Sequence, residues 1–455
     1  MEDKENIRVA IAGAGLTGLT TAFYLKKAGI PFVVFEKEDR PGGVIQTHHE
    51  NGFTFESGPN SGILSKPEVV ELLEELQHEC TLEVADDAAE ARWIWKNNRW
   101  VPLPSGLVSG ISTPLFSFPD KLRLLGEPFR KKGTNPNESL AQLVLRRMGK
   151  SFLNYAIDPF ILGIYSGDPG RLVTQYAFPK LYNLEQNYGS FIGGALKKAK
   201  EPKSERDKKA TKEIFSVKGG LSNMIHALAT NVGEENIRLN SNNLSFAQKG
   251  SKFLCSQSSE EFSHVISTTG GYALPELFPF LEKEKLGSIT QMEYSKVIQV
   301  SVGFNNWHGI PLNAFGGLVP FIEQRKILGA LFLSSFFKDK APEKGALLSV
   351  FLGGIRRPEI AELSDEKIVE IVRTELTEMF HLKKFEPDLL KIFRYSHAIP
   401  QYGFESEEKL KTIETLEKQH PGLILAGNIR DGIGIADRIN QGRTVAAKIA
   451  NIEHE

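Results

Sequence analysis

The first forty residues alternate between apolar and glycine-rich segments, and this pattern predicts a strand, a turn, a helix and a second strand. Residues 8–13 and 31–36 are nearly continuous apolar runs, and residues 19–28 between them have a helical pattern. Such runs, bounded by glycine, are typical of strands buried on both faces, as in a parallel sheet covered by helices. The start of the chain is therefore predicted to be a βαβ unit of an α/β fold.

The pattern changes further along the chain. Residues 93–188 are rich in Pro and Gly, with helical segments at 138–148 and 153–162, and predict a mostly helical insertion. The dense charge run at 201–212 predicts an exposed connector. Strand patterns then return, and their ranges are 237–246, 265–269, 297–304, 327–333 and 347–352, the last three predicting an antiparallel sheet. Residues 423–428 predict a buried strand, and residues 442–452 a closing helix.

Composition excludes several classes of protein. The chain has 455 residues, 41% of them hydrophobic, which is typical of a globular protein. Its 55 Lys and Arg nearly balance 56 Asp and Glu, so no nucleic-acid partner is expected. Cys80 and Cys255 form neither a disulfide framework nor a metal-ligand pair, so a reducing compartment and no metal are expected. No secretion signal or membrane span is recognised, which predicts a cytoplasmic protein and leaves surface attachment open.

A glycine motif follows the first strand. Gly13, Ala14, Gly15, Leu16, Thr17 and Gly18 stand between strand and helix, and Glu36 ends the next strand. Gly13 allows a tight turn, Gly15 lets a pyrophosphate approach the backbone, and Gly18 permits close helix packing, while Glu36 can accept hydrogen bonds from ribose hydroxyls. The motif predicts an ADP-containing cofactor and by itself leaves NAD and FAD open.

Two further turns favour FAD. Arg40, Pro41, Gly42 and Gly43 come directly after Glu36, where a second glycine pair lets another loop approach the diphosphate. Gly58, Pro59, Asn60 and Ser61 form a turn whose backbone N–H groups could face an isoalloxazine ring. Read as an ordinary turn, this second segment has no functional meaning.

Motifs along almost the whole chain resemble those of the protoporphyrinogen and coproporphyrinogen oxidases, FAD enzymes of the flavin amine oxidase superfamily. The resemblance rests on the glycine motifs, on residues 158–168 (DPFILGIYSGD), 217–221 (VKGGL) and 399–402 (IPQY), and on the segment at 425–437. It implies an FAD-binding Rossmann-like domain of the GR2 type from residues 1–90, 213–270 and 395–455. It also implies a helical, membrane-contacting domain at 91–195 and a β-rich substrate-binding domain at 271–394.

The resemblance also implies a set of cofactor contacts. Val44 departs from other members, which often carry a basic or larger residue there, and Leu244 is assigned to the adenine side on a strand whose register could slip by one. FAD is expected to be non-covalent, because no cysteine follows Cys255. Besides the glycine motif and Glu36, the implied contacts are Lys37, Arg40, Gly42, Gly43, Val44, Gly58, Pro59, Asn60, Ser61, Leu244, Gly427, Asn428, Ile433, Gly434 and Ile435.

For the substrate, the resemblance implies a flat pocket between the flavin and a sheet. Phe315, Leu318 and Phe351 would contact the macrocycle together with the backbone of Gly163, although such apolar residues are more often ordinary strand core. Arg92 would pair with a substrate propionate, because a guanidinium binds a carboxylate by two parallel hydrogen bonds. Lys66 is a second candidate, and the alternative for Arg92 is a solvated surface residue.

The implied reaction is the oxidation of protoporphyrinogen IX to protoporphyrin IX in haem biosynthesis, by hydride transfer to flavin N5 without a catalytic side chain. Three other interpretations stay open: a coproporphyrinogen III oxidase, a flavin amine oxidase and a non-catalytic flavin-stabilised membrane scaffold. The expected partners are the porphyrinogen, molecular oxygen or a quinone-linked acceptor, a membrane surface and a second copy of the chain in a homodimer. Residues 103–118, with Lys121, Arg123, Arg130, Lys131 and Lys132, either contact an anionic membrane or cover the substrate tunnel.

Overall fold

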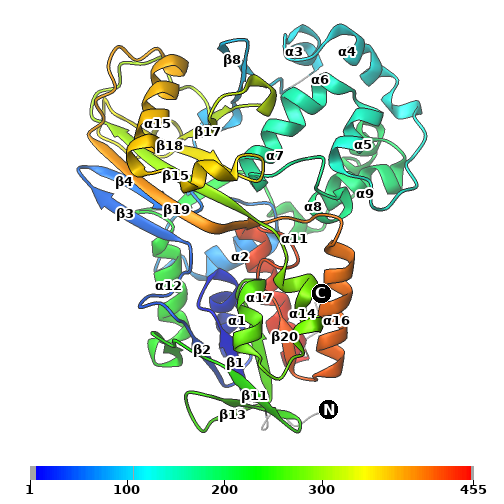
Figure 1. Ribbon diagram of the computed structural model, residues 1–455, viewed down its shortest axis with the longest axis vertical. Helices are drawn as coiled ribbons and strands as arrows, with labels where there is room; N and C mark the ends of the chain where they lie inside the picture. The colour runs from blue at the N-terminus through cyan, green and yellow to red at the C-terminus, as the bar shows by residue number, and fades with distance from the viewer. Residues whose placement is uncertain (1–6, 106, 452–455) are drawn as a thin grey trace.

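A parallel sheet forms the lower half of the molecule in Figure 1, which shows a computed structural model that describes residues 7–105 and 107–451. Val9 of the first strand is in register with Phe32 on one side and with His264 on the other. Strands from the two ends of the chain thus meet in one sheet. Its strands, in spatial order, are β10 (Ile237–Arg238), β2 (Phe32–Phe35), β1 (Val9–Ala12), β14 (His264–Ser267) and β20 (Leu423–Leu425).

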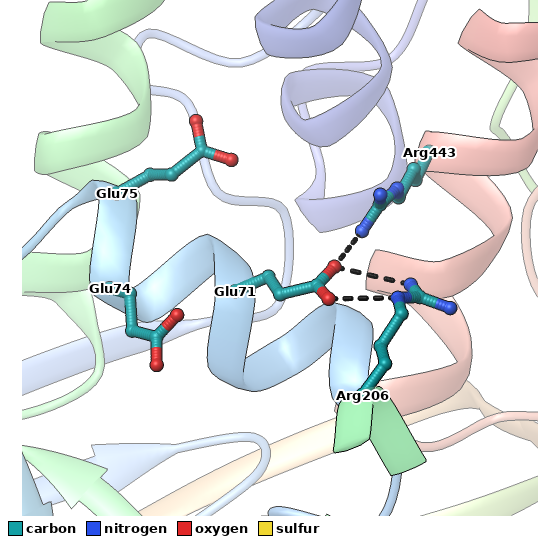
Figure 2. Close-up of a pocket in the computed structure, with 5 residues that line it drawn as sticks. All are labelled: Glu71, Glu74, Glu75, Arg206 and Arg443. Atoms are coloured by element: carbon teal, nitrogen blue, oxygen red, sulfur yellow. Dashed lines mark hydrogen bonds and ion pairs between the residues drawn. The ribbon is translucent and has the colours of Figure 1, made fainter. Parts of the chain in front are cut away.

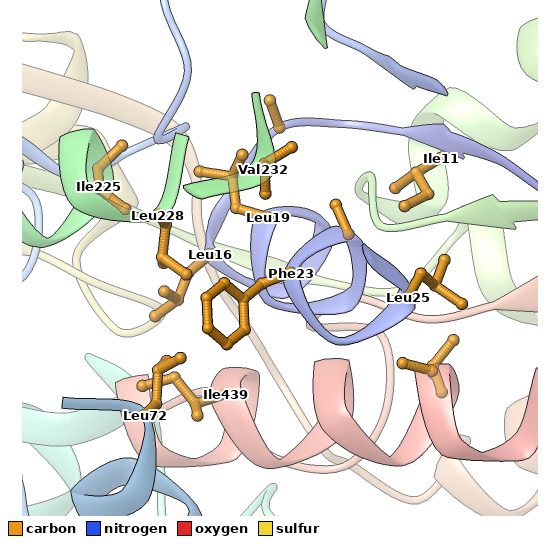
Figure 3. Close-up of a cluster of buried hydrophobic side chains, with 14 of the residues drawn as sticks. Ile11, Leu16, Leu19, Phe23, Leu25, Leu72, Ile225, Leu228, Val232 and Ile439 are labelled. Carbon is orange, nitrogen blue, oxygen red and sulfur yellow. The ribbon is translucent and has the colours of Figure 1, made fainter. Parts of the chain in front are cut away.

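Both faces of the parallel sheet are covered, which explains why β1, β2 and β20 are apolar throughout. On one face, Leu19, Phe23 and Ile439 belong to a large apolar cluster (Figure 3). Its helices are α1 (Leu16–Lys27), α2 (Pro67–Glu75), α12 (Ser222–Val232) and α17 (Ile435–Ala450). The other face is covered by α13 (Leu274–Leu277), α14 (Lys283–Thr290), α16 (Ser406–Gln419) and the antiparallel strands β11 (Phe246–Lys249), β12 (Lys252–Cys255) and β13 (Glu261–Phe262).

The strand expected through Leu244 is wrong in its middle. Residues 239–245 form no strand, and Asn240 and Asn243 adopt positive φ angles of 55° and 59°. Asparagine tolerates this left-handed conformation because its short polar side chain can bond locally. Leu244 therefore lies in a turn between β10 and β11. It is partly buried and packs against the apolar cluster on the face of the parallel sheet that α13, α14 and α16 cover.

A second, mixed sheet fills the upper left of Figure 1. Its face away from the parallel sheet is covered by α15 (Asp365–Phe380), through an apolar cluster that includes Val350 and Leu376. The strands predicted at 297–304, 327–333 and 347–352 are confirmed. In spatial order, the strands are β19 (Leu389–Pro400), β15 (Tyr294–Phe304), β18 (Ala346–Gly353), β17 (Ile327–Phe332), β16 (Gly316–Leu318), β7 (Arg92–Lys96) and β8 (Arg99–Pro102).

The helical interpretation of residues 93–188 is wrong at its start, because β7 and β8 form a hairpin of this mixed sheet. β7 runs parallel to β16, with Trp93 opposite Gly317. The tryptophans of the hairpin pack edge to face, with 5.0 Å between the ring centroids of Trp95 and Trp100. Such long-range pairing has no local sequence signal, which explains the error.

Two small sheets join the parallel sheet to the mixed one. The hairpin of β3 (Gln46–Glu50) and β4 (Phe53–Ser57) packs Phe53 and Phe55 into an apolar cluster below the mixed sheet. The other small sheet contains β5 (Gly62–Ile63), β9 (Ile214–Val217) and β6 (Leu82–Val84).

The helical region occupies the upper right of Figure 1, and its interior holds paired charges. Arg147, fully buried, donates to the Glu127 carboxylate at 2.7 Å and also bonds Glu185. Its elements are α3 (Leu107–Ser112), α4 (Phe118–Leu125), α5 (Leu140–Arg147), α6 (Lys150–Phe152), a π-helix (Leu153–Ile157), α7 (Asp158–Tyr165), α8 (Thr174–Ala177), α9 (Pro179–Tyr188) and α10 (Phe191–Lys198). The short helix α11 (Glu205–Lys208) follows them and lies beside α2.

Candidate functional site

The predicted glycine turn joins β1 to α1 and leaves an open side at Gly15. Gly13 has a φ of +105°, and its N–H donates to Phe35 O at 2.7 Å. A Cβ on Gly18 would lie 2.0 Å from Gly13 O, so the helix can approach the turn only with glycine there. A Cβ on Gly15 would meet nothing within 4 Å. The turn is thus closed on the protein side and open at the positive end of α1, where phosphate oxygens are bound in many proteins.

Glu36 lies beside this turn at the end of β2. Its buried carboxylate accepts hydrogen bonds from the N–H groups of Ala14, at 2.8 Å, and of Glu38, at 3.1 Å. A carboxylate has about four acceptor positions, so it can still accept from ribose hydroxyls. Lys37 points outward and pairs with Glu38 at 3.3 Å.

The loop after Glu36 is folded against the glycine turn. Gly42 N donates to Ala14 O at 2.8 Å, and a Cβ on Gly43 would lie 3.4 Å from the Cα of Gly15. Arg40 donates to the carbonyls of Pro41, Gly43 and Ile45, so its guanidinium fixes the shape of this loop. At the end of the loop, Val44 is 62% exposed, an unusual place for an apolar side chain beside a polar turn.

The turn at Gly58 is held by a residue of the mixed sheet. Gly58, with a φ of +96°, donates its N–H to Oε1 of Gln299 at 2.9 Å. Nε2 of the buried Gln299 donates to Glu56 O and to Ser349 Oγ. Asn60 is also buried, and its Nδ2 donates to Gly58 O at 3.3 Å, while its Oδ1 is buried without a partner in the described chain. Pro59 and Ser61, on either side of Asn60, are partly buried.

The last predicted segment lies between β20 and α17. Tyr402 donates its hydroxyl to Asn428 O at 2.9 Å and to Gly432 O at 3.1 Å. Gly427 has a φ of +84°, and a Cβ there would lie 2.7 Å from Thr268 O. Gly434 is the N-cap of α17, followed by the buried Ile435, and Ile433 packs against the apolar cluster of the helical region. This loop therefore brings a second helix N-terminus to the site.

The two helices cross closely beside the glycine turn. A Cβ on Gly442 of α17 would lie 2.8 Å from Thr17 O of α1. Thr17 Oγ1, like Asn60 Oδ1, is buried without a hydrogen-bond partner in the described residues. Buried polar atoms normally have partners, and several others in the described chain, such as Thr20 Oγ1, also lack one, so these two atoms are consistent with a polar ligand only because the open glycine turn lies beside them. The open glycine turn, the free acceptors of Glu36 and the helix N-termini fit FAD.

The predicted substrate residues lie on the mixed sheet and on α7. A Cβ on Gly163 of α7 would lie 2.8 Å from Leu318 Cδ2, so the structure brings these two residues together. Across neighbouring strands, Leu318 lies opposite Gly329, Gly329 opposite Phe351, and Phe351 opposite Gln299. These residues therefore share one face of the sheet. Because Gln299 holds the Gly58 turn, this face is the one that meets the cofactor loops.

Arg92 and Phe315 lie at one edge of this face. The Arg92 guanidinium lies 5.5 Å from the centroid of the Phe315 ring, and its Nη1 donates to Glu90 O at 3.3 Å. Burial lowers the pKa of Arg92 from its ordinary value. No carboxylate of the described residues lies within 4 Å of Arg92, whereas Lys66 is paired with Asp437 at 3.0 Å. Arg92 is thus a partly buried cation without an ion pair.

Sequence reasoning missed Gln299 and the role of Tyr402. Gln299 is one of two polar residues, with Ser301, within the apolar run at 297–304, and a buried amide side chain in a central strand is a signal that could have identified it. Tyr402 belongs to a motif used only for the resemblance. Neither contact could be assigned from spacing, because each joins segments far apart in the sequence.

A polar cavity of about 540 Å³ lies elsewhere, beside α2 (Figure 2). Burial acts to raise the pKa of Glu71, but hydrogen bonds from Arg206 and Arg443 outweigh it and lower that pKa. Glu74 and Glu75, which also line the cavity, are paired with Lys209 and Lys27. These charges bind one another, so the cluster fastens the connector helix α11 and α17 to α2.

Comparison with known proteins agrees with this geometry. The family described as flavin containing amine oxidoreductase matches residues 16–450. The chain belongs to this family. It is therefore an oxidoreductase and a flavoprotein by family, and its resemblance to porphyrinogen oxidases is confirmed by curated relatives.

These relatives carry two different names. Mitochondrial protoporphyrinogen oxidase of Nicotiana tabacum is 31% identical over 98% of the chain and 95% of the relative. Coproporphyrinogen III oxidase of Bacillus subtilis is 26% identical over 96% of the chain and 97% of the relative. A crystal structure of a putative protoporphyrinogen oxidase from Exiguobacterium has a TM-score of 0.81 at 23% identity, covering 98% of the chain and 99% of that protein. The predicted mixed α/β fold is confirmed.

Proposed function

We propose that the chain is an FAD-dependent protoporphyrinogen oxidase, which converts protoporphyrinogen IX to protoporphyrin IX in haem biosynthesis. One observation carries this proposal: a cradle that fits FAD faces the sheet surface that carries Leu318 and Phe351, with the cation Arg92 at its edge. FAD, when bound, supplies the two-electron acceptor. The cofactor is expected to be non-covalent, with oxygen or a quinone as the final acceptor.

The residues of the cradle have separate roles in this proposal. The turns at Gly15 and Gly43 and the N-terminus of α1 would hold the diphosphate, and Glu36 would hold the adenosine ribose. The Gly58 turn, kept in place by Gln299, and the loop before α17 would hold the flavin end. Leu244, in the turn between β10 and β11, would lie at the adenine side of the cofactor.

The apolar face would orient the substrate. Leu318 and Phe351 offer a flat surface, and the absence of a Cβ at Gly163 lets the Leu318 side chain pack directly against α7. Positioning of this kind supplies most of what the reaction needs, because the conjugated product provides the driving force. No side-chain acid or base is assigned.

Arg92 is the proposed specificity residue. A partly buried guanidinium without a carboxylate partner suits a substrate propionate, and the ring of Phe315 keeps it in place. Protoporphyrinogen has two propionates and coproporphyrinogen has four. A single unpaired cation at this edge therefore favours protoporphyrinogen, whereas a coproporphyrinogen oxidase would need further cations.

The test is a direct competition. The purified protein, with its flavin confirmed by absorption, is given each porphyrinogen under identical aerobic conditions, and porphyrin fluorescence is followed. We expect faster oxidation of protoporphyrinogen and a KM about tenfold higher in Arg92→Gln, the loss of one charge-assisted hydrogen-bonded pair of about 1.5–3 kcal/mol. Arg99→Gln, at an exposed position of the adjacent strand β8, is the control.

Other outcomes of this assay contradict the proposal. Preference for coproporphyrinogen would assign the chain to the other group of relatives. Bound flavin that neither porphyrinogen reduces would support an amine oxidase or a flavin-stabilised scaffold.

We also propose that α3, α4 and the turn after them contact an anionic membrane surface. Phe118, Leu125 and Phe129 are 71%, 70% and 89% exposed, and Arg130, Lys131 and Lys132 follow directly. Apolar side chains beside basic ones bind anionic lipid surfaces. No helix in the described part of the chain is long and apolar enough to cross a bilayer.

Vesicle sedimentation tests this contact. We expect binding to phosphatidylserine vesicles, loss of that binding in Phe118→Ser with Phe129→Ser, and no change in Ile322→Ser, an exposed apolar residue elsewhere. Wild-type protein that stays in the supernatant would favour a role for this segment in covering the substrate tunnel.

A further inference from the structure

A lysine is buried behind the loop that leads into α17. Lys409 lies on α16 and is 0% exposed. Lysine is almost never fully buried without a partner of opposite charge, because the ammonium loses its hydration. No carboxylate of the described chain lies within 4 Å of its Nζ, which instead contacts Met292 Sδ at 3.1 Å.

The other neighbour of Lys409 is Tyr402. The ammonium lies 4.5 Å from the centroid of the Tyr402 ring, within the range of a cation–π interaction. The Tyr402 hydroxyl donates to Asn428 O and Gly432 O, the two carbonyls described above. A cation over the ring draws electron density from the phenol and makes its hydroxyl a better donor. Lys409 is therefore coupled through one side chain to the loop assigned to the flavin.

A second buried cation acts on the same loop. Arg438 of α17 donates to Arg430 O at 2.9 Å and to Gly432 O at 2.8 Å. The carbonyls of this loop are thus bound by donors inside the protein. At the start of α17, Gly434 N donates to the Asp437 carboxylate and Asp437 N to Gly434 O, which leaves the N–H groups of Ile435 and Ala436 available to a ligand.

We propose that Lys409 is a positioning residue for the flavin: through Tyr402 its buried ammonium holds the loop before α17 and raises the reduction potential of the bound cofactor. The proposal rests on FAD binding at the site described above. A flavin gains negative charge when it is reduced, and a cation in a low-dielectric interior stabilises that charge. This gain explains why an unpaired ammonium is kept inside the protein.

The proposal has a pH signature. Burial lowers the pKa of Lys409 to about 8, and Glu405 at the start of α16 opposes this shift. As the pH rises through 8, the lysine loses its charge and the reduced flavin loses its stabilisation, so the potential falls more steeply than in a variant without this titration. The other groups around the pair are the thioether of Met292, the phenol of Tyr165 on α7 and, beyond the Tyr402 ring, Arg438, Asp431 and Asp437.

The experiment measures the flavin reduction potential of the holoenzyme against a reference dye, without porphyrinogen. In Lys409→Met, we expect the ratio of reduced to oxidised flavin at a fixed potential to fall about tenfold, which is about 30 mV for two electrons. Lys409→Arg keeps the charge and is expected to keep the potential. Lys411→Met, an exposed lysine on the same helix that pairs with Glu407, is the matched control and is expected to match the wild type.

Each outcome decides the question. An unchanged potential in flavin-loaded Lys409→Met would overturn the proposal. If that variant does not keep its flavin, potentials of wild type and Lys409→Arg are compared between pH 7 and pH 9: an extra fall in the wild type alone supports the proposal, and parallel curves contradict it. A wild-type protein without flavin would contradict the proposed function instead.

Discussion

The helical region and the cofactor cradle differ in how their buried side-chain oxygens are paired. In the helical region, Glu127 accepts from Arg147, from Ser190 Oγ and from the N–H groups of Phe191 and Ile192. In the cradle, Thr17 Oγ1 and Asn60 Oδ1 are buried without a partner among the described residues. An oxygen without a partner points to a ligand where it lies beside an open backbone turn, as Asn60 Oδ1 does, whereas the unpartnered Arg123 Nε and Arg130 Nε of the helical region lie beside no such turn.

The comparison separates structural charges from functional ones. Arg147 is more buried than Arg92, but it has two carboxylates and Arg92 has none. The charges around the polar cavity of Figure 2 belong with Arg147, because Glu71 binds both Arg206 and Arg443. Burial alone is therefore a weak guide to the site, and burial without a partner is a better one.

The largest effect is expected from breaking the helical network. Arg147→Met leaves Glu127 buried without a cation and leaves Glu185 with Arg146 alone, and breaking a buried pair in this way typically lowers the free energy of unfolding by about 3–5 kcal/mol. Urea denaturation followed by circular dichroism measures this loss. Arg146→Met is the control, because Arg146 is partly exposed and pairs with Glu138 as well as Glu185. Equal losses in the two variants would contradict the distinction.

Lowering the pH should destabilise the helical region before the cofactor cradle. Burial acts to raise the pKa of Glu127 and Glu185, but hydrogen bonds from backbone N–H groups and arginines outweigh it, so both values lie below the ordinary 4.5. Their contribution to stability is present above pH 4.5 and is lost as the pH falls through the lowered values. Burial raises the pKa of Glu56, beside the cradle, so protonation of this carboxyl does not destabilise the fold as the pH falls. Hydrogen exchange at falling pH should show opening of α5 and α9 before β4, and the reverse order would contradict this.

A methyl group at Gly15 should weaken cofactor binding and spare the fold. Gly15 has a φ of −70°, which alanine adopts freely, and its Cβ would meet no protein atom within 4 Å. We expect the Kd for FAD in Gly15→Ala to rise at least about tenfold, or 1.4 kcal/mol. Titration of the apoprotein by flavin fluorescence measures it. The control is Gly287→Ala in α14, which also meets open space; a fall in stability at Gly15 alone would contradict the prediction.

The smallest effects are expected from removing the hydroxyl group of Ser139 or of Thr17. Ser139 caps α5 and accepts from Gln142 N, so Ser139→Ala should lower stability by about 1 kcal/mol. Thr17→Val removes a hydroxyl without a partner, so the apoprotein should lose no stability while FAD binds more weakly. Thermal melts with and without FAD distinguish the two variants, and a destabilised Thr17→Val apoprotein would be the contrary result.

The sequence predicts the parallel sheet better than it predicts the mixed one. The strands at Val9 and Leu423 are apolar on both faces and are flanked by glycine turns, which is a strong local signal. The pairing of β7 with β16 joins Arg92 to Gly316, and nothing local in either segment indicates it. The break before Leu244 depends on two asparagines in left-handed conformations, which the strand pattern hid.

The candidate site was predictable where glycines mark a turn. Gly13, Gly18 and Gly58 have positive φ angles or no room for a Cβ, so their identity follows from the backbone. Gln299 and Lys409 could not be assigned, because their meaning depends on which distant segments they contact. Arg40, which is predicted as a cofactor contact, also donates to carbonyls of its own loop, and this role could not be derived from its spacing.

The order of the strands also constrains biosynthesis. The parallel sheet places β14 between β1 and β20, so the cradle needs residues 9–12 and residues 423–425 together. A nascent chain presents its glycine turn long before β20 and α17 are synthesised. A ligand that needs the whole cradle can therefore be held only after these late elements have folded against β14 and α1, and a stop codon before β20 would release a polypeptide without a complete cradle.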